Sequence, residues 1–223
     1  MRDLVEGHLS DLTEPDFSAG QHVASRINDI LRPLGALQRL DELAIFMAGW
    51  QGSATPQVAR PSILIFAADH GVAAAGVSAY PAALTESMMT AFHSGVSTIN
   101  ALARVAGATV TAVDVGVGQP TKDIQYEAAM SPERFAASWE AGQIAVQNLD
   151  CDLLVLGEMG IGNTTPSAAI SAALFGGEAT DWVGRGTGVD DEGLIRKRAA
   201  VERAVKRIGT ETPYEILRQL GGR

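Results

Sequence analysis

The apolar positions of the chain follow two patterns, short continuous runs and stripes that recur every three or four residues. Short runs predict strands over residues 62–68, 108–116 and 152–156. The first run is apolar throughout, which is typical of a strand covered on both faces. Helical stripes separate the runs. Strands that alternate with helices indicate βαβ units, so we expect an α/β fold with a Rossmann-like parallel sheet and flanking helices.

The helical stripes divide the chain into an N-terminal helical segment, residues 1–50, and an α/β core, residues 51–223. Pro33 and Gly35 predict two helices in the first part, one ending near Leu31 and one starting near Leu37. In the core we expect helices over about 84–105 with a break at Gly95, 131–149, 165–175, 191–208 and 214–220. Two stripes are expected to be buried: Leu37, Leu40, Leu43 and Met47, and Phe135, Trp139, Gly142, Val146 and Leu149.

Composition narrows the class of protein. The chain has 223 residues, 46% of them hydrophobic, which excludes intrinsic disorder and allows one well-buried core. Its net charge of −9 argues against nucleic acid or an anionic membrane as the main partner, although a small anionic substrate can still bind in a locally positive pocket. The single cysteine, Cys151, excludes a disulfide framework and a cysteine-rich zinc site.

The sequence shows neither a signal peptide nor a membrane span. The first twelve residues, MRDLVEGHLSDL, contain no apolar stretch of the signal-peptide kind. No segment approaches the roughly 18 apolar residues of a spanning helix. We therefore expect a cytoplasmic protein.

The strongest chemical signal is the glycine-rich stretch 157–165, GEMGIGNTT, between a predicted strand and a predicted helix. Ligands of parallel α/β sheets bind beyond the carboxyl ends of strands, and glycines let the backbone approach an anion there. Gly160, Gly162, Asn163 and Thr164 therefore predict a phosphate site. The alternative is a tight turn with capping threonines. Glu158 lies inside this loop, at the end of an apolar strand, where burial would raise its pKa and suit it to general-base or hydrogen-bonding work. The alternative is that Glu158 is a solvated acidic residue of the loop.

A second glycine loop, Gly184–Gly188, precedes a predicted helix. Asp190 and Asp191 at the start of that helix are typical of caps rather than catalytic groups. Lys197 and Arg185 could supply positive charge to a phosphate.

Asp69 and His70 end the first predicted strand, which invites a metal or an acid–base interpretation. The alternative is a turn with a satisfied histidine. No other His or Cys has metal-ligand spacing, so we expect no metal.

Taken together, four segments resemble one family, nicotinate-nucleotide–dimethylbenzimidazole phosphoribosyltransferase, which makes the lower-ligand nucleotide of cobalamin. They are FAADHGVAAAGVSAYP at 66–81, INALARVAGATVTAVDVGV at 99–117, GEMGIGNTT at 157–165 and VGRGTGVDDEGLIRKRAAVERA at 183–204. The end of the chain, YEILRQLGG, also fits. The resemblance extends from about residue 20 to the end.

The resemblance implies a reaction in which a benzimidazole nitrogen attacks C1′ of nicotinate mononucleotide, giving α-ribazole 5′-phosphate and nicotinate. It implies no cofactor, small-molecule substrates only and a homodimer. Glu158 matches the family's acidic residue. The phosphoribosyl group would be held by Gly160, Gly162, Asn163, Thr164, Gly186, Thr187, Gly188 and Lys197. The base pocket would be formed by Asp69, Ser78, Tyr80, Pro81 and Met88.

The sequence also departs from the family pattern. Family members continue past the LGG at 220–222 for a further third of their length, and that continuation carries the glutamate usually assigned as catalytic base. The segment Glu86-Ser87-Met88 lacks a glutamine common there, and the loop after Val117 is shorter than usual. Three hypotheses follow: an active phosphoribosyltransferase, a shortened paralogue that binds nicotinate mononucleotide or an azole without efficient turnover, and a fragment of an ordinary enzyme.

Overall fold

The computed structural model describes residues 12–33 and 35–222, which form two compact units. One unit holds the described residues up to Pro61 together with Asp150–Leu153. The other holds Ser62–Leu149 and the described residues from Leu154 onward.

The first unit is built on two helices, α2 (Phe17–Asp29) and α3 (Arg39–Gln51). Asp16 caps α2 by accepting hydrogen bonds from the backbone N–H groups of Ser18 and Ala19. The buried residues of the pair are small or short: Ala19, Gly20, Val23, Ala48 and Gly49.

The buried stripe expected along α3 is therefore wrong. Leu37, Leu40 and Leu43 are 49%, 60% and 43% exposed. The physical reason is that α3 turns Ala48 and Gly49 toward α2, because small side chains allow the two helices to approach closely, and the leucines lie on other faces.

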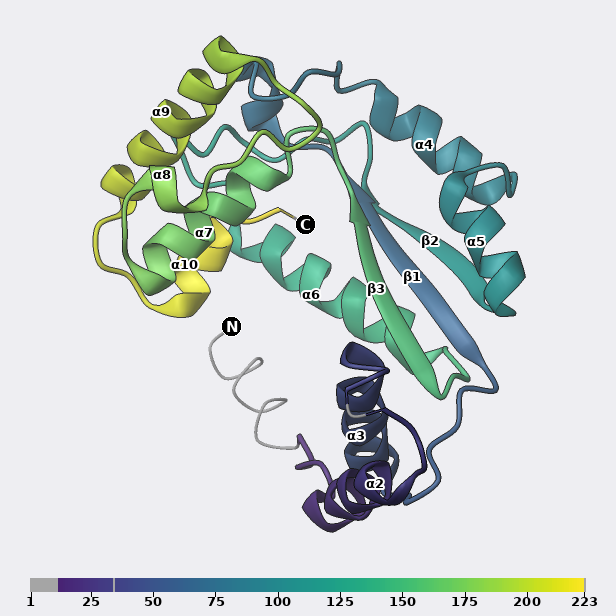
Figure 1. Ribbon diagram of the computed structural model, residues 1–223. Helices are drawn as coiled ribbons and strands as arrows, with labels where there is room; N and C mark the ends of the chain where they lie inside the picture. Colours follow the sequence, from purple (N-terminus) through teal and green to yellow (C-terminus); the bar gives the residue numbers. More distant parts are fainter. Residues whose placement is uncertain (1–11, 34, 223) are drawn as a thin grey trace. The chain divides into compact units, whose positions relative to one another are not determined.

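The second unit is centred on a three-stranded sheet in the order β2-β1-β3, as Figure 1 shows. The strands are β1 (Pro61–Ala68), β2 (Thr109–Gly116) and β3 (Leu153–Met159). Strands β1 and β2 pair in parallel, with Ser62 opposite Thr109. The central strand β1 is buried along nearly its whole length, as its continuous apolar run predicts. The predicted α/β class with a parallel sheet is confirmed.

Helices lie against both faces of this sheet (Figure 1). On one side are α4 (Leu84–His93) and α5 (Thr98–Ala106), which are separated at Gly95 as predicted. On the other side is α6 (Pro132–Gln147), which Ser131 caps by accepting a hydrogen bond from the N–H of Arg134. Only Phe135 of the stripe expected in α6 is fully buried. Trp139, Gly142 and Val146 instead line an open groove, together with Leu156 of β3.

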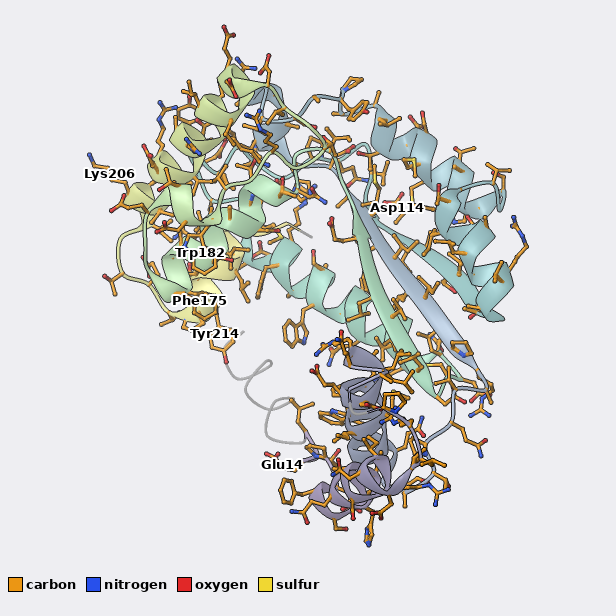
Figure 2. All side chains as sticks on the ribbon, viewed as in Figure 1. Glu14, Asp114, Phe175, Trp182, Lys206 and Tyr214 are labelled. Carbon is orange, nitrogen blue, oxygen red and sulfur yellow. The ribbon has the colours of Figure 1, made fainter. Side chains whose placement is uncertain are left out.

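A helical cluster continues from the carboxyl ends of the strands. It contains the short 3-10 helix η1 (Gly71–Ala75) and the helices α7 (Thr164–Phe175), α8 (Ala179–Trp182), α9 (Asp191–Ile208) and α10 (Pro213–Leu220). The larger apolar core lies here, among residues such as Val72, Ala169 and Val201. Phe175 and Trp182 pack ring against ring at its surface, with centroids 6.0 Å apart (Figure 2). This core holds α7 and α9 together, and both helices carry residues expected in the site.

Candidate functional site

Three carboxylates lie where the parallel strands end. Asp69 follows β1, Asp114 is near the end of β2, and Glu158 is the penultimate residue of β3. Asp114, labelled in Figure 2, shapes its own turn by accepting hydrogen bonds of 2.8 Å from the N–H groups of Gly116 and Val117. Asp69 accepts a 2.7 Å hydrogen bond from the N–H of Gly118. Asp114 and Asp69 thus accept hydrogen bonds from backbone N–H groups, whereas Glu158 accepts one from a side chain, the amide of Asn163.

The stretch from Gly160 to Thr164 forms a tight turn against the end of β1. A Cβ atom on Gly160 would lie 2.3 Å from the carbonyl oxygen of Ala68 and 2.8 Å from Nε2 of His70, so only glycine fits. Gly162 adopts a φ of +88°, in the left-handed region that favours glycine. The hydroxyl of Thr85, fully buried in α4, accepts a 3.2 Å hydrogen bond from the N–H of Ile161. Sterics and this hydrogen bond fix the turn.

Part of the backbone of this turn is already used internally. The N–H of Asn163 donates to the carbonyl of Gly160 at 3.1 Å, and the N–H of Thr165 donates to that of Gly162 at 3.0 Å. The loop is a hydrogen-bonded turn, as one alternative predicts, and it also lines a cavity, so the phosphate site stays a prediction.

The second glycine loop leads into α9. Gly186 and Gly188 have φ values of +55° and +102°. Asp190 caps α9 by accepting a 2.7 Å hydrogen bond from the N–H of Gly193, which confirms its predicted role as a cap. Asp191 pairs with Arg185 across this loop.

Lys197 comes up from α9 beneath the two glycine loops. Its side chain is only 2% exposed, and Nζ donates a 2.9 Å hydrogen bond to the carbonyl of Gly184. A Cβ atom on Gly186 would lie 3.0 Å from this Nζ and 3.3 Å from Oγ1 of Thr164, so all three residues converge on one point. Burial lowers the pKa of Lys197. No carboxylate in the described part of the chain forms an ion pair with it, and such a buried cation favours an anionic ligand.

These residues surround a cavity of about 210 Å³, here called the lysine cavity. Its lining residues are Val77, Ser78, Glu158, Met159, Gly160, Ile161, Gly162, Asn163, Thr164, Arg185, Gly186, Thr187 and Lys197. The structure thus brings together Glu158 and all the residues expected around the phosphoribosyl group except Gly188, which lies in the turn beside them. Arg185 is a further cation at this cavity.

Glu158 differs from its expected setting. The sequence predicted a loop position and burial, but β3 continues to Met159 and the side chain of Glu158 is exposed. The strand is longer because Gly157 still packs on Ile65 of the central strand, its Cβ position 3.4 Å from that side chain. The expected burial fails because β3 is an edge strand of the described sheet. Here the carboxylate accepts a hydrogen bond from the side-chain amide of Asn163.

A second cavity, of about 180 Å³, is here called the histidine cavity. It shares Glu158, Met159 and Asn163 with the lysine cavity, and its other lining residues are Phe66, Ala68, His70, Pro166, Ser167, Ile170 and Gly222. His70 is 8% exposed, and its Nδ1 has no hydrogen-bond partner among the described residues. Burial lowers the pKa of His70 to about 4, against the opposing effect of Asp69, so the ring is neutral near pH 7. Neither the metal or acid–base interpretation nor the turn with a satisfied histidine is decided by this geometry, so both stay predictions.

The residues expected in the base pocket do not gather around one cavity. Ser78 lines the lysine cavity. Tyr80 is 51% exposed, Pro81 is exposed and Met88 is half-buried in α4, and none of them lines either cavity. Asp69 anchors the loop after β2 through Gly118. Sequence reasoning missed Thr85, Ser167 and the histidine cavity, because contacts between residues far apart in the chain leave no local pattern.

No group of three or more His, Cys, Asp or Glu side chains in residues 12–33 and 35–222 is arranged to hold a metal ion. Within the same ranges, no helix combines the length and apolar character that crossing a membrane requires.

The chain is similar to a known protein family. A family pattern described as "Phosphoribosyltransferase" (DBI_PRT) matches residues 12–223. A nicotinate-nucleotide–dimethylbenzimidazole phosphoribosyltransferase of Ruegeria pomeroyi is 47% identical over 209 residues, which cover 94% of this chain and 62% of the relative. Its namesake in Mesorhizobium japonicum is 46% identical over 223 residues, covering 99% of this chain and 66% of the relative. The chain thus spans a little under two thirds of the length of these curated relatives.

The fold also has solved counterparts. The crystal structure of CobT from Thermus thermophilus superposes with a TM-score of 0.85 at 38% sequence identity, over 92% of this chain and 67% of that one. A second structure from the same organism, of a nicotinate-nucleotide-dimethylbenzimidazole phosphoribosyltransferase, gives a TM-score of 0.84 at 35% identity, over 93% of this chain and 67% of that one.

Proposed function

The chain belongs to the DBI_PRT family of phosphoribosyltransferases, and from this premise we propose that it acts on nicotinate mononucleotide and 5,6-dimethylbenzimidazole or a related azole. The phosphoribosyl group passes to the azole, giving α-ribazole 5′-phosphate and nicotinate. The observation that carries the proposal is the buried Lys197, which has no carboxylate partner in the described chain and faces the same cavity as Glu158.

The phosphate end of the nucleotide binds in the lysine cavity. Lys197 and Thr164 supply a cation and a hydroxyl at one point, and Gly186 leaves the space for them. Arg185 adds a second positive charge. Holding the phosphate fixes the ribose, so that C1′ is presented to the attacking nitrogen in one geometry.

Glu158 is the acid–base residue of the proposal. The azole nitrogen gives its lone pair to C1′, the bond from C1′ to the pyridine nitrogen breaks, and its electrons stay with the departing ring. The azole then carries one proton too many, and the Glu158 carboxylate accepts it. The same negative charge stabilises the positive charge that develops on the ribose in the transition state. Ser78, Tyr80, Pro81, Met88 and Asp69 are proposed to form the azole side.

We further propose a cytoplasmic homodimer. Exposed apolar side chains support association, among them Leu156 on the edge strand β3 at 66% and Phe175 at 76%. Sedimentation equilibrium tests the dimer, and cell fractionation tests the location, which rests on the sequence analysis alone.

Turnover tests the function directly. The purified chain is incubated with nicotinate mononucleotide and 5,6-dimethylbenzimidazole, and α-ribazole 5′-phosphate is measured by chromatography and mass. Glu158→Gln should lower the rate by more than it lowers nucleotide affinity. The matched control is Glu140→Gln, which neutralises an exposed carboxylate of α6 that lines neither cavity. Nucleotide binding without product from the folded chain would overturn the activity in favour of a binding protein.

A further inference from the structure

Residues 76–83, here called the connecting loop, join η1 to α4 and include Ser78, Tyr80 and Pro81 of the proposed azole side. Figure 1 shows this loop running from η1, beside α9, to α4. Residues 79–83 are exposed, so little packs on the middle of the loop. The position of the azole side therefore depends on what holds the two ends of the loop.

The first end of the connecting loop is tied to elements that form the lysine cavity. Nε of Arg196 donates a 3.1 Å hydrogen bond to the carbonyl of Gly76, and Arg196 is the neighbour of Lys197 on α9. In η1, Ala73 packs against the glycine turn, because the Cβ position on Gly162 lies 3.3 Å from the Cα atom of Ala73. A hydrogen bond and close packing therefore hold this end against the proposed phosphate site.

The second end of the connecting loop is tied by Thr85, in the first turn of α4. The backbone N–H of Thr85 donates a 3.0 Å hydrogen bond to the carbonyl of Ala82, inside the loop. Its fully buried hydroxyl accepts the 3.2 Å hydrogen bond from the N–H of Ile161. Ile161 lines the lysine cavity between Gly160 and Gly162. Thr85 thus contacts the loop with its backbone and the glycine turn with its side chain.

We propose that Thr85 is a positioning residue, which fixes the azole side relative to the phosphate end of the nucleotide through its hydrogen bond with Ile161. The inference rests on the proposed function for the identity of both ligands. In that reaction the azole nitrogen must approach C1′ in one geometry, and the bound phosphate determines where C1′ lies. A tie between the two sides therefore acts on the rate of transfer more than on the affinity for either ligand.

The hydroxyl is the part of Thr85 that this role requires. Thr85→Val keeps nearly the same shape but leaves the buried N–H of Ile161 without this acceptor. Thr85→Ser keeps the hydroxyl and removes only a methyl group. The matched control is Thr90→Val, because Thr90 is exposed on the same helix and its hydroxyl donates to the carbonyl of Glu86 within α4. The three variants separate the tie from packing and from the helix.

The first test follows the tie itself in the full chain, with inorganic phosphate as the probe and backbone amide NMR as the readout. Glu86 and Met88 follow Thr85 on α4 and line neither cavity. In the wild type, phosphate bound in the lysine cavity should shift their amide signals. The shifts should be lost in Thr85→Val, return in Thr85→Ser and persist in Thr90→Val, while phosphate affinity changes by less than about threefold in each variant.

The second test compares kinetic constants. Thr85→Val should lower kcat about tenfold or more and leave KM for nicotinate mononucleotide and 5,6-dimethylbenzimidazole within about threefold, and Thr85→Ser should restore most of the rate. A raised KM with unchanged kcat, or phosphate-induced shifts that survive in Thr85→Val, would overturn the positioning role. The NMR test requires no product, so a chain without turnover that loses the shifts in Thr85→Val keeps the tie and loses only the proposed activity.

Discussion

The side-chain amide of Asn163 donates a hydrogen bond to the carboxylate of Glu158, and this pair belongs to the walls of both cavities. The two residues are held by different elements. Glu158 is at the end of β3, and the backbone N–H of Asn163 is tied to Gly160 in the turn that follows. The amide therefore sets where the carboxylate lies at the boundary of the two cavities.

Replacing Asn163 with aspartate tests this arrangement. Asn163→Asp puts two carboxylates at hydrogen-bonding distance, and their repulsion raises the pKa of the pair. We expect kcat/KM to fall about tenfold or more near pH 7 and its acid limb to move to higher pH. Asn148→Asp, an exposed change at the end of α6, is the matched control and should keep the wild-type profile. A simple loss of rate with no change in the pH profile would contradict the positioning role.

Lys197 should control anion binding rather than stability. Lys197→Met removes a buried cation that has no carboxylate partner in the described chain, so the apolar replacement should leave the free energy of unfolding unchanged or raise it. Inorganic phosphate should bind about tenfold more weakly or worse. Isothermal titration and urea unfolding measure the two effects. Loss of stability with intact phosphate binding would show that the lysine is structural.

Gly160 and Gly142 differ in the space around their Cβ positions. A Cβ atom on Gly160 would meet the backbone of Ala68 at 2.3 Å, whereas nothing lies within 4 Å of the Cβ position on Gly142. We expect Gly160→Ala to lower the free energy of unfolding by about 2 kcal/mol or more. Gly142→Ala in α6 should raise it by about 0.5–1 kcal/mol. Equal effects in urea unfolding would mean that the turn at Gly160 is not confined as the structure has it.

The sheet and the glycine loops could be predicted from the sequence because their signals are local. The continuous apolar run of β1 specifies a buried central strand, and glycines mark the turns that need them. The break at Gly95 and the cap at Asp190 are local in the same sense. The sequence next to each of these features is therefore enough to predict it.

The failed expectations concern burial, which depends on what packs against a residue. The leucines of α3 have helical spacing, yet the structure exposes them because Ala48 and Gly49 make the contact with α2. Glu158 follows an apolar strand, but that strand is at the edge of the described sheet. The contact between Thr85 and Ile161 joins residues 76 positions apart, a separation that no local pattern encodes.

The buried imidazole of His70 should make stability depend on pH. Its pKa is about 4 in the folded chain, below the ordinary value of 6.5 expected on unfolding. Between these values the unfolded chain binds a proton that the folded chain does not, so the free energy of unfolding rises with pH across this window. The shift corresponds to a loss of about 3 kcal/mol as the pH falls from 6.5 to 4.

Urea unfolding of wild type and His70→Gln at a series of pH values checks this. Both chains share the same carboxylates, so the difference between their curves isolates the histidine. The variant should lose less stability than the wild type as the pH falls through the window. His93→Gln, at an exposed histidine of α4, should follow the wild type. Parallel curves for His70→Gln and wild type would mean that the pKa of His70 is the same in the folded and the unfolded chain.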